Sequence, residues 1–150
     1  MINEKLIPKT NYVIMKPTAD QTLSTTEQKV NLNQVSKVGN KLSVSNNQCV
    51  IGTGVSKIKI SGAFYLQTGG DNQYEKICYI YKNSTWVARA NTHVNHNYQH
   101  LKIPAFILDV QQGDKIDMRA KTNTTASVTG MKVPNSANNF DTYMMVEVIN

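Results

Sequence analysis

Three histidines form the pattern in this chain that most suggests metal chemistry. His93, His96 and His100 are separated by two and then by three residues, and histidine is a common zinc ligand. A helix would place all three on one face, but the Asn-rich surroundings form helices poorly. On a strand, His93 would face away from His96 and His100. The sequence therefore favours solvated loop histidines and predicts no metal site, although a trimer could bring three copies of one histidine together on its axis.

The acidic residues suggest a second kind of site. Asp109, Asp114 and Asp117 lie close to one Gly-Asp turn, and carboxylate oxygens are ligands that calcium prefers. Turn formation by itself accounts for Asp114, however. The chain has no Gly-x-Ser-x-Gly motif, no glycine-rich phosphate-binding loop and no nucleophile with an evident base. The sequence therefore predicts neither a cofactor nor an enzyme, and a glycan-cleaving enzyme is the least favoured class.

Aromatic side chains near predicted turns are the candidates for ligand contact. Tyr74, Trp86 and Tyr98 lie nearest to such turns, where an exposed ring could stack on a sugar. Aromatic residues inside strands more often belong to a core or to an interface. These three residues are therefore the predicted ligand-binding positions.

The composition indicates one domain with an uncharged polar surface. The chain has 150 residues, of which 40% are hydrophobic and 17% are charged, below the usual quarter. Asn, Thr, Ser and Gln supply the remaining polarity, as is common in extracellular and viral β-proteins. The net charge is +6, but the lysines are scattered and Arg89 and Arg119 are the only arginines. Nucleic-acid readers rely on arginine clusters and stacking platforms, so no nucleic-acid partner is expected.

The cysteines and the N-terminus bear on the compartment. Cys49 and Cys78 each lie in an apolar, strand-like run, which favours buried free thiols and leaves a disulfide open. The N-terminal residues lack the apolar core of a signal peptide, and no apolar run is long enough to span a membrane. We therefore expect a protein that is made in the cytoplasm and is not inserted into a membrane.

From residue 29 onward, β-strand patterns recur at short spacing with turns between them. The clearest strand covers residues 57–66, where alternate residues are apolar, and no amphipathic helix longer than about two turns appears. Residues 1–28 are polar and hold one short apolar run. The sequence predicts an all-β domain over residues 29–150, preceded by an extended N-terminal arm over residues 1–28.

Two predicted strands are apolar on both sides. In residues 75–82, Tyr79 and Tyr81 face one way while Cys78 and Ile80 face the other. In residues 142–149, Tyr143 and Met145 face one way, and the other side is formed by Met144, Val146 and Val148. A strand that is apolar on both faces needs two burial partners. This pattern indicates that the second face is buried in an oligomer.

The order of these segments resembles a known architecture. A strand containing Ile-Ser-Gly-Ala-Phe-Tyr (residues 60–65) is followed by a Gly-Gly turn and a Tyr-rich strand. Then come Ile-Leu-Asp-Val (107–110), Gln-Gly-Asp-Lys-Ile (112–116) and a terminal Tyr-Met-Met-Val (143–146). Over residues 29–149 the chain resembles the jelly-roll β-sandwich of tumour necrosis factor and the complement globular heads. The bacteriophage fibre and baseplate version is nearest in composition.

The resemblance implies a homotrimer whose axis is packed by aromatic and aliphatic side chains. The expected interface residues are those of the two doubly apolar strands, namely Tyr79, Tyr81, Tyr143 and Met145. The animal members carry signal peptides and often a collagen stalk, and this chain shows neither, which favours the phage version. In that version the N-terminal arm attaches the trimer to other virion proteins and the tip faces the host.

We therefore expect a phage virion structural protein, either a head or tail fibre or a receptor-binding module that contributes to host attachment. A host cell-surface glycan is a possible partner. The alternative is a non-viral, carbohydrate-binding β-sandwich module.

Overall fold

The computed structural model describes residues 10–67, 75–92, 98–122, 132–133 and 142–149, and all of its regular elements are β-strands. The side chains of residues 67, 98, 99, 132 and 133 are outside this description. The strands are β1 (Tyr12–Lys16), β2 (Gln21–Thr22), β3 (Gln28–Lys29), β4 (Gln34–Val38), β5 (Leu42–Ser45), β6 (Gln48–Ile51), β7 (Lys57–Gln67), β8 (Lys76–Lys82), β9 (Thr85–Thr92), β10 (Tyr98–Asp109), β11 (Lys115–Thr122), β12 (Lys132–Val133) and β13 (Tyr143–Val148).

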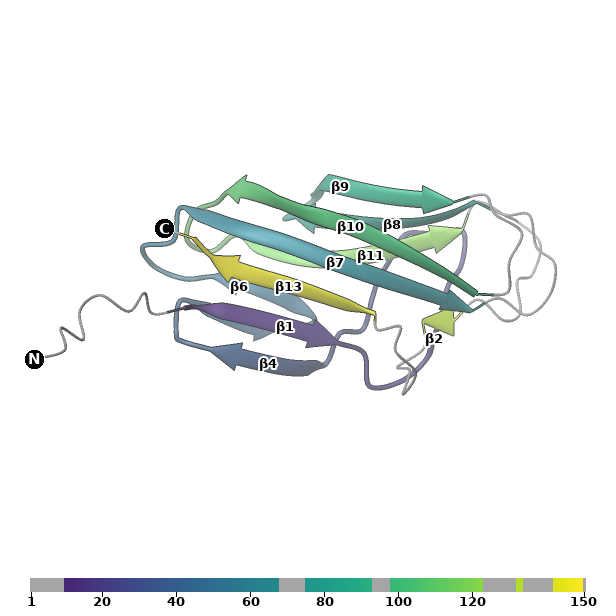
Figure 1. The fold of residues 1–150 in the computed structure, drawn as a ribbon, viewed down its shortest axis with the longest axis horizontal. Coiled ribbons are helices and arrows are strands. Elements are labelled where there is room, and N and C mark those ends of the chain that lie inside the picture. Colours follow the sequence, from purple (N-terminus) through teal and green to yellow (C-terminus); the bar gives the residue numbers. More distant parts are fainter. Residues whose placement is uncertain (1–9, 68–74, 93–97, 123–131, 134–141, 150) are drawn as a thin grey trace, which may run out of the picture.

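The strands form two sheets that pack face to face (Figure 1). In the first sheet the order is β10-β7-β13-β1-β4; the short strand β12 also pairs with the last residue of β7, and β2 pairs with β12. In the second sheet the order is β5-β6-β11-β8-β9, and β3 pairs with β11. Every pair is antiparallel. The chain crosses repeatedly between the sheets, which makes the domain the predicted jelly-roll β-sandwich.

The long strand β7 supplies the centre of the core. Its predicted apolar face is confirmed, since Ile58, Ile60, Phe64 and Leu66 are all fully buried. At Gly62, on the same face, an added Cβ would lie 3.0 Å from the Met118 Cε atom of the second sheet. Glycine at this position therefore lets the two sheets approach closely.

Tight turns connect neighbouring strands at asparagine and glycine residues. Asn46 and Asn47 join β5 to β6 with φ angles of 52° and 58°, the left-handed values that a two-residue hairpin turn requires. Gly39 lies in the turn between β4 and β5 with φ of 83°. Asn tolerates a positive φ better than other non-glycine residues, which explains why Asn46 and Asn47 form the turn between β5 and β6.

Residues 10–28, expected as part of an N-terminal arm, contribute directly to the sandwich. The strand β1 lies between β13 and β4 in the first sheet, and its Val13 and Met15 side chains are fully buried. The alternation of Tyr12-Val-Ile-Met15 is the signal that these residues also enter the core. Residues 1–9 lie outside the described part of the chain.

Both cysteines are buried in the second sheet as free thiols. Cys49 lies on β6 and Cys78 on β8, and both belong to the apolar core. Burial raises the pKa of the Cys49 thiol to about 12 and also raises the pKa of Cys78. Both thiols are therefore protonated at neutral pH and behave as small apolar side chains.

Candidate functional site

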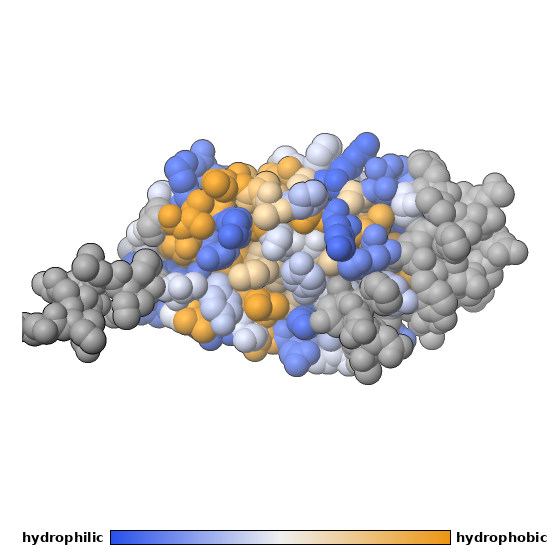
Figure 2. Space-filling model, viewed as in Figure 1, coloured by the Kyte–Doolittle hydropathy of each residue, from blue (hydrophilic) through white to orange (hydrophobic). Residues whose placement is uncertain are grey.

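The outer face of the first sheet is the first candidate surface. Alternate residues of β1 and β13 are buried in the core, so the residues between them point outward. The outward residues pair across the strands, with Ile14 opposite Met145 and Met145 opposite Ser61. We call this surface the assembly face, and its centre consists of Tyr12, Ile14, Ser61, Ala63, Tyr143 and Met145. Figure 2 views the molecule onto this side, where orange and pale atoms lie among separate blue ones.

Two exposed apolar side chains extend the assembly face towards its edges. Val38 on β4 pairs with Tyr12 and is 44% exposed, while Ile107 on β10 is 62% exposed. Ile107 lies opposite Lys59 on β7, whose ammonium group is 3.1 Å from the Glu147 carboxylate. Apolar contact area thus reaches from one edge strand of the sheet to the other, with an exposed ion pair inside it.

The assembly face has small side chains on one of its strands and a hollow at one edge. Ser61 and Ala63 lie on β7, between β10 and β13. A shallow hollow at the β1–β4 edge is lined by Ile14, Lys16, Gln34, Val35 and Ser36. A partner surface could therefore approach the backbone of β7 closely and place a side chain in the hollow.

The structure places His100 on β10 and leaves His93 and His96 outside the described residues. The His100 ring meets the Tyr65 ring edge-on, with centroids 6.4 Å apart. Within the described ranges, no group of three or more His, Cys, Asp or Glu residues could hold a metal ion. His100 therefore packs against the Tyr65 side chain of the neighbouring strand β7.

The aspartates near the β10–β11 turn have protein partners. The Asp114 carboxylate accepts hydrogen bonds from Asn83 Nδ2 and from the Gln111 N–H, both at 3.0 Å, and lies 3.4 Å from Lys82 Nζ. Burial raises the pKa of Asp114, but these hydrogen bonds and the Lys82 charge outweigh burial and hold the pKa below its usual value. The geometry is that of a turn-stabilising carboxylate, as the sequence predicts.

The outer face of the second sheet is the second candidate surface, and it is aromatic. Tyr79 and Tyr81 lie on β8 with ring centroids 6.0 Å apart, and Trp86 on β9 lies 6.3 Å from Tyr79. Tyr79 is only 4% exposed and Tyr81 only 6% within a single chain. By contrast, Trp86 is 50% exposed. The two tyrosines are thus already covered, and Trp86 is available to a ligand.

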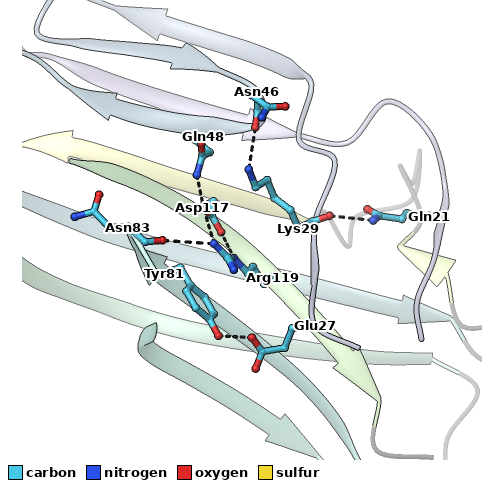
Figure 3. A network of polar contacts seen from close by, with 9 residues as sticks. All are labelled: Gln21, Glu27, Lys29, Asn46, Gln48, Tyr81, Asn83, Asp117 and Arg119. Carbon is cyan, nitrogen blue, oxygen red and sulfur yellow. Dashed lines mark hydrogen bonds and ion pairs between the residues drawn. The ribbon is translucent and has the colours of Figure 1, made fainter. Parts of the chain in front are cut away.

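Long polar side chains from β11 cover the tyrosines, and Figure 3 shows Arg119 beside Tyr81. The Arg119 guanidinium lies 3.9 Å from the centroid of the Tyr81 ring, and Lys121 Nζ lies 5.9 Å from that of Tyr79. The Tyr81 hydroxyl donates a hydrogen bond to Glu27. Burial and this carboxylate raise the pKa of Tyr81 to about 12.

A buried carboxylate holds Arg119 in this position. Asp117 is fully buried and accepts hydrogen bonds at 2.7 Å from Arg119 Nε and from Gln48 Nε2. The hydrogen bond to Asp117 raises the pKa of the Arg119 guanidinium. The network joins β6, β8 and β11 and fixes the outer face of the second sheet (Figure 3).

The four residues predicted for one interface lie on two sheets. Tyr143 and Met145 belong to the assembly face, whereas Tyr79 and Tyr81 lie on the outer face of the second sheet. The sequence pattern identified the second apolar side of β8 correctly. It did not show that Arg119 and Lys121 cover this side of β8 within the same chain, because their strand β11 is distant from β8 in the sequence.

The predicted ligand contacts are likewise separated. Trp86 lies in the second sheet and Tyr98 begins β10 in the first, while Tyr74 lies outside the described residues. The residue that accompanies Trp86 is Arg89, whose guanidinium carbon is 5.8 Å from the centroid of the tryptophan ring. No sequence pattern marks Arg89 as a site residue, because its proximity to Trp86 depends on the register of β9.

In the described part of the chain, no helix is long and apolar enough to cross a membrane.

Comparisons with known proteins identify the fold. No family model and no curated protein matches the sequence. Among solved structures, the chain is similar to murine APRIL in crystals at pH 8.5, pH 5.0 and pH 8.0, with TM-scores of 0.69, 0.65 and 0.60. In each case 11% of residues are identical, and the match covers 94% of this chain and 100% of the other. APRIL has the tumour necrosis factor jelly roll. At this identity the likeness is one of fold, and this chain therefore has a jelly-roll β-sandwich of the tumour necrosis factor type.

Proposed function

We propose that this chain is a homotrimeric attachment module, a bacteriophage virion structural protein of the fibre or receptor-binding kind. The single observation that carries the proposal is the assembly face. Its Ile14, Tyr143 and Met145 side chains are only partly buried in the protomer, and Tyr143 and Met145 lie opposite the small residues Ala63 and Ser61. Apolar surface of this kind gains about 25 cal/mol per Å² when a partner covers it.

The edges of the assembly face fit a protein interface. Stable interfaces combine an apolar centre with a polar rim. Here Lys102 on the edge strand β10 and Lys16 at the end of β1 supply polar groups at the margin, while the Lys59–Glu147 ion pair lies inside the face, between its apolar centre and Ile107. In a closed trimer each protomer meets two neighbours through different surfaces. The exposed Ile107 and Val38 side chains on opposite edge strands supply apolar area for both contacts.

The arrangement of the strand ends supports an attachment role. The Val148 N–H donates a hydrogen bond to the Asn11 carbonyl oxygen, so the first and last described segments lie at the same end of the sandwich (Figure 1). The ends of β7 and β9 and the starts of β8 and β10 lie at the opposite end. A trimer built this way has one end for the virion and one end for the host.

Substitution of Met145 tests the assembly face. The wild type should be a trimer, and Met145→Asp should be a folded monomer, because a charge would be buried at an apolar contact without a partner. Ser43→Asp, on β5 of the second sheet, adds the same charge at an exposed position and should remain trimeric. Light scattering reports the mass and circular dichroism the fold. If Met145→Asp is still a trimer of unchanged stability, Met145 is not in the interface.

The virion setting is tested by the genes beside this one. Virion assembly genes on both sides would support it, whereas metabolic genes on both sides would contradict it.

A non-viral carbohydrate-binding module is the second candidate, and one observation favours it. Trp86 is half exposed beside Tyr79, as a sugar-stacking ring must be. This candidate predicts a monomer that binds glycans through Trp86 and has no virion genes nearby. A wild-type trimer would contradict it.

A further inference from the structure

We infer that the outer face of the second sheet binds an anionic carbohydrate, a sugar with a carboxylate or phosphate group beside its ring. The site is a row of side chains that we call the aromatic strip, consisting of Lys121, Tyr79, Trp86 and Arg89. The inference deepens the proposed function and rests on it only for the attachment role, since the strip is complete within one protomer.

The aromatic strip offers one accessible ring on a rigid base. Trp86 lies opposite Tyr81 in the β8–β9 hairpin, and β8 in turn pairs along its length with β11. The Tyr79 ring is inclined by 52° to the Trp86 ring at a centroid distance of 6.3 Å and lies beside it on the neighbouring strand β8. Because Trp86 is held by a paired strand, a sugar that stacks on it does not have to order a loop.

The charge on the aromatic strip selects an anion. Asp117 engages Arg119, and Glu27 lies 3.9 Å from Lys121 while it accepts a hydrogen bond from Tyr81. Among the described residues, the exposed Arg89 guanidinium lies over the face of Trp86. Arg89 can therefore bind an incoming carboxylate or phosphate with its planar set of N–H donors.

The size of the apolar surface favours a sugar over a protein segment. Trp86 is the one large apolar side chain of the second sheet that is exposed in the described residues. A peptide or helix partner needs several apolar anchors in a row, whereas one sugar ring needs one aromatic face. The neighbouring groups are polar, and they can hydrogen-bond sugar hydroxyls.

The location of the aromatic strip leaves it accessible in a trimer. The assembly face is the outer face of the first sheet and the aromatic strip is on the outer face of the second, so the core lies between them. Three protomers that associate through the assembly face would each present one strip outward. Binding to a surface coated with the sugar would then gain from multivalency.

Fluorescence provides a direct test, because Trp86 is the only tryptophan of the chain. The full-length protein would be titrated with trigalacturonic acid, with glucose 6-phosphate and with neutral maltotriose. We expect a saturable change in Trp86 emission with at least one acidic sugar, a much smaller change with maltotriose, and weaker binding as salt is added. The acidic sugar that responds identifies the anionic group.

Arg89→Gln should weaken binding of the acidic sugar roughly tenfold, because it removes a charge-assisted hydrogen bond. Lys37→Gln, which removes the same charge on β4 of the first sheet, should leave binding unchanged. Trp86→Ala, assayed by calorimetry, should abolish binding, while circular dichroism checks that the protein remains folded. Equal responses to acidic and neutral sugars, equal effects of Arg89→Gln and Lys37→Gln, or no response to either acidic sugar would each overturn the inference.

Measuring the mass of the wild-type protein alongside sugar binding distinguishes a failure of this inference from a failure of the proposed function. A trimer without acidic-sugar binding would contradict the aromatic strip and leave assembly intact. A monomer that binds acidic sugars through Trp86 and Arg89 would contradict the trimeric module and support the strip.

Discussion

At the scale of single residues, the buried Asp117 carboxylate organises the outer face of the second sheet. It fixes Arg119 over Tyr81, and the Tyr81 hydroxyl then reaches Glu27 on the segment before β3. The sequence could indicate that Asp114 belongs to a turn, because a Gly-Asp pair has local chemistry. It could not indicate the partner of Asp117, because Gln48 is 69 residues away along the chain.

The two arginines allow a matched test of this network. Arg119→Met should lower the free energy of unfolding by about 3 kcal/mol, because it leaves the Asp117 carboxylate buried with a single neutral donor. Arg89→Met removes an exposed arginine from the same sheet and should change stability by less than about 0.5 kcal/mol. Urea denaturation measures both. Equal losses for the two variants would show that the Asp117–Arg119 pair contributes no more than an exposed arginine.

Asp114 should make stability depend on pH. Its pKa is lower in the folded protein than its ordinary value, so its contribution is present above about pH 3.9, the ordinary pKa of Asp. The contribution is lost as pH falls through the lower folded-state pKa. Asp114→Asn should therefore be less stable than wild type at neutral pH and approach it in acid.

Asp109→Asn is the comparison for Asp114, measured by thermal unfolding across the same pH range. Its ion pair with Lys57 is exposed, so solvent screening should make its effect smaller. A constant difference between Asp114→Asn and wild type at all pH values would contradict the assignment.

At the scale of elements, alternation and turn residues account for what the sequence predicts well. Alternating apolar residues predict the core face of β7, and the consecutive asparagines predict the Asn46–Asn47 hairpin turn. Pro104 predicts an edge strand or bulge, and β10 is an edge strand whose register shifts between Ile103 and Phe106. The two-residue strands β2, β3 and β12 are too short to show any period, and only tertiary pairing defines them.

The Asn46–Asn47 turn offers a test at this scale. Asn47→Val should destabilise the protein by about 1–2 kcal/mol, because a β-branched residue resists the positive φ of this position. Asn47→Gly, which accepts this conformation freely, should be as stable as the wild type or more so. Thermal unfolding of the three proteins measures the order. If Val and Gly are equivalent, the backbone conformation of the turn does not limit stability.

At the scale of the whole molecule, the sandwich separates two surfaces with different character. The assembly face is broad and apolar, with small residues at its centre, and the aromatic strip is narrow and flanked by cations. The sequence predicted the fold and the doubly apolar strands. It could not show that Tyr143 and Met145 lie on one side of the core and Tyr79 and Tyr81 on the other, since that depends on which sheet each strand joins.

The mass of the wild-type protein in solution shows whether the assembly face is buried between protomers. We expect one species of about 50 kDa at micromolar concentration, three times the 16.7 kDa of a single chain. It should persist on dilution, as expected when an apolar face is buried. A stable species of 16.7 kDa at the same concentration would contradict the homotrimer, because the assembly face would then remain open to water.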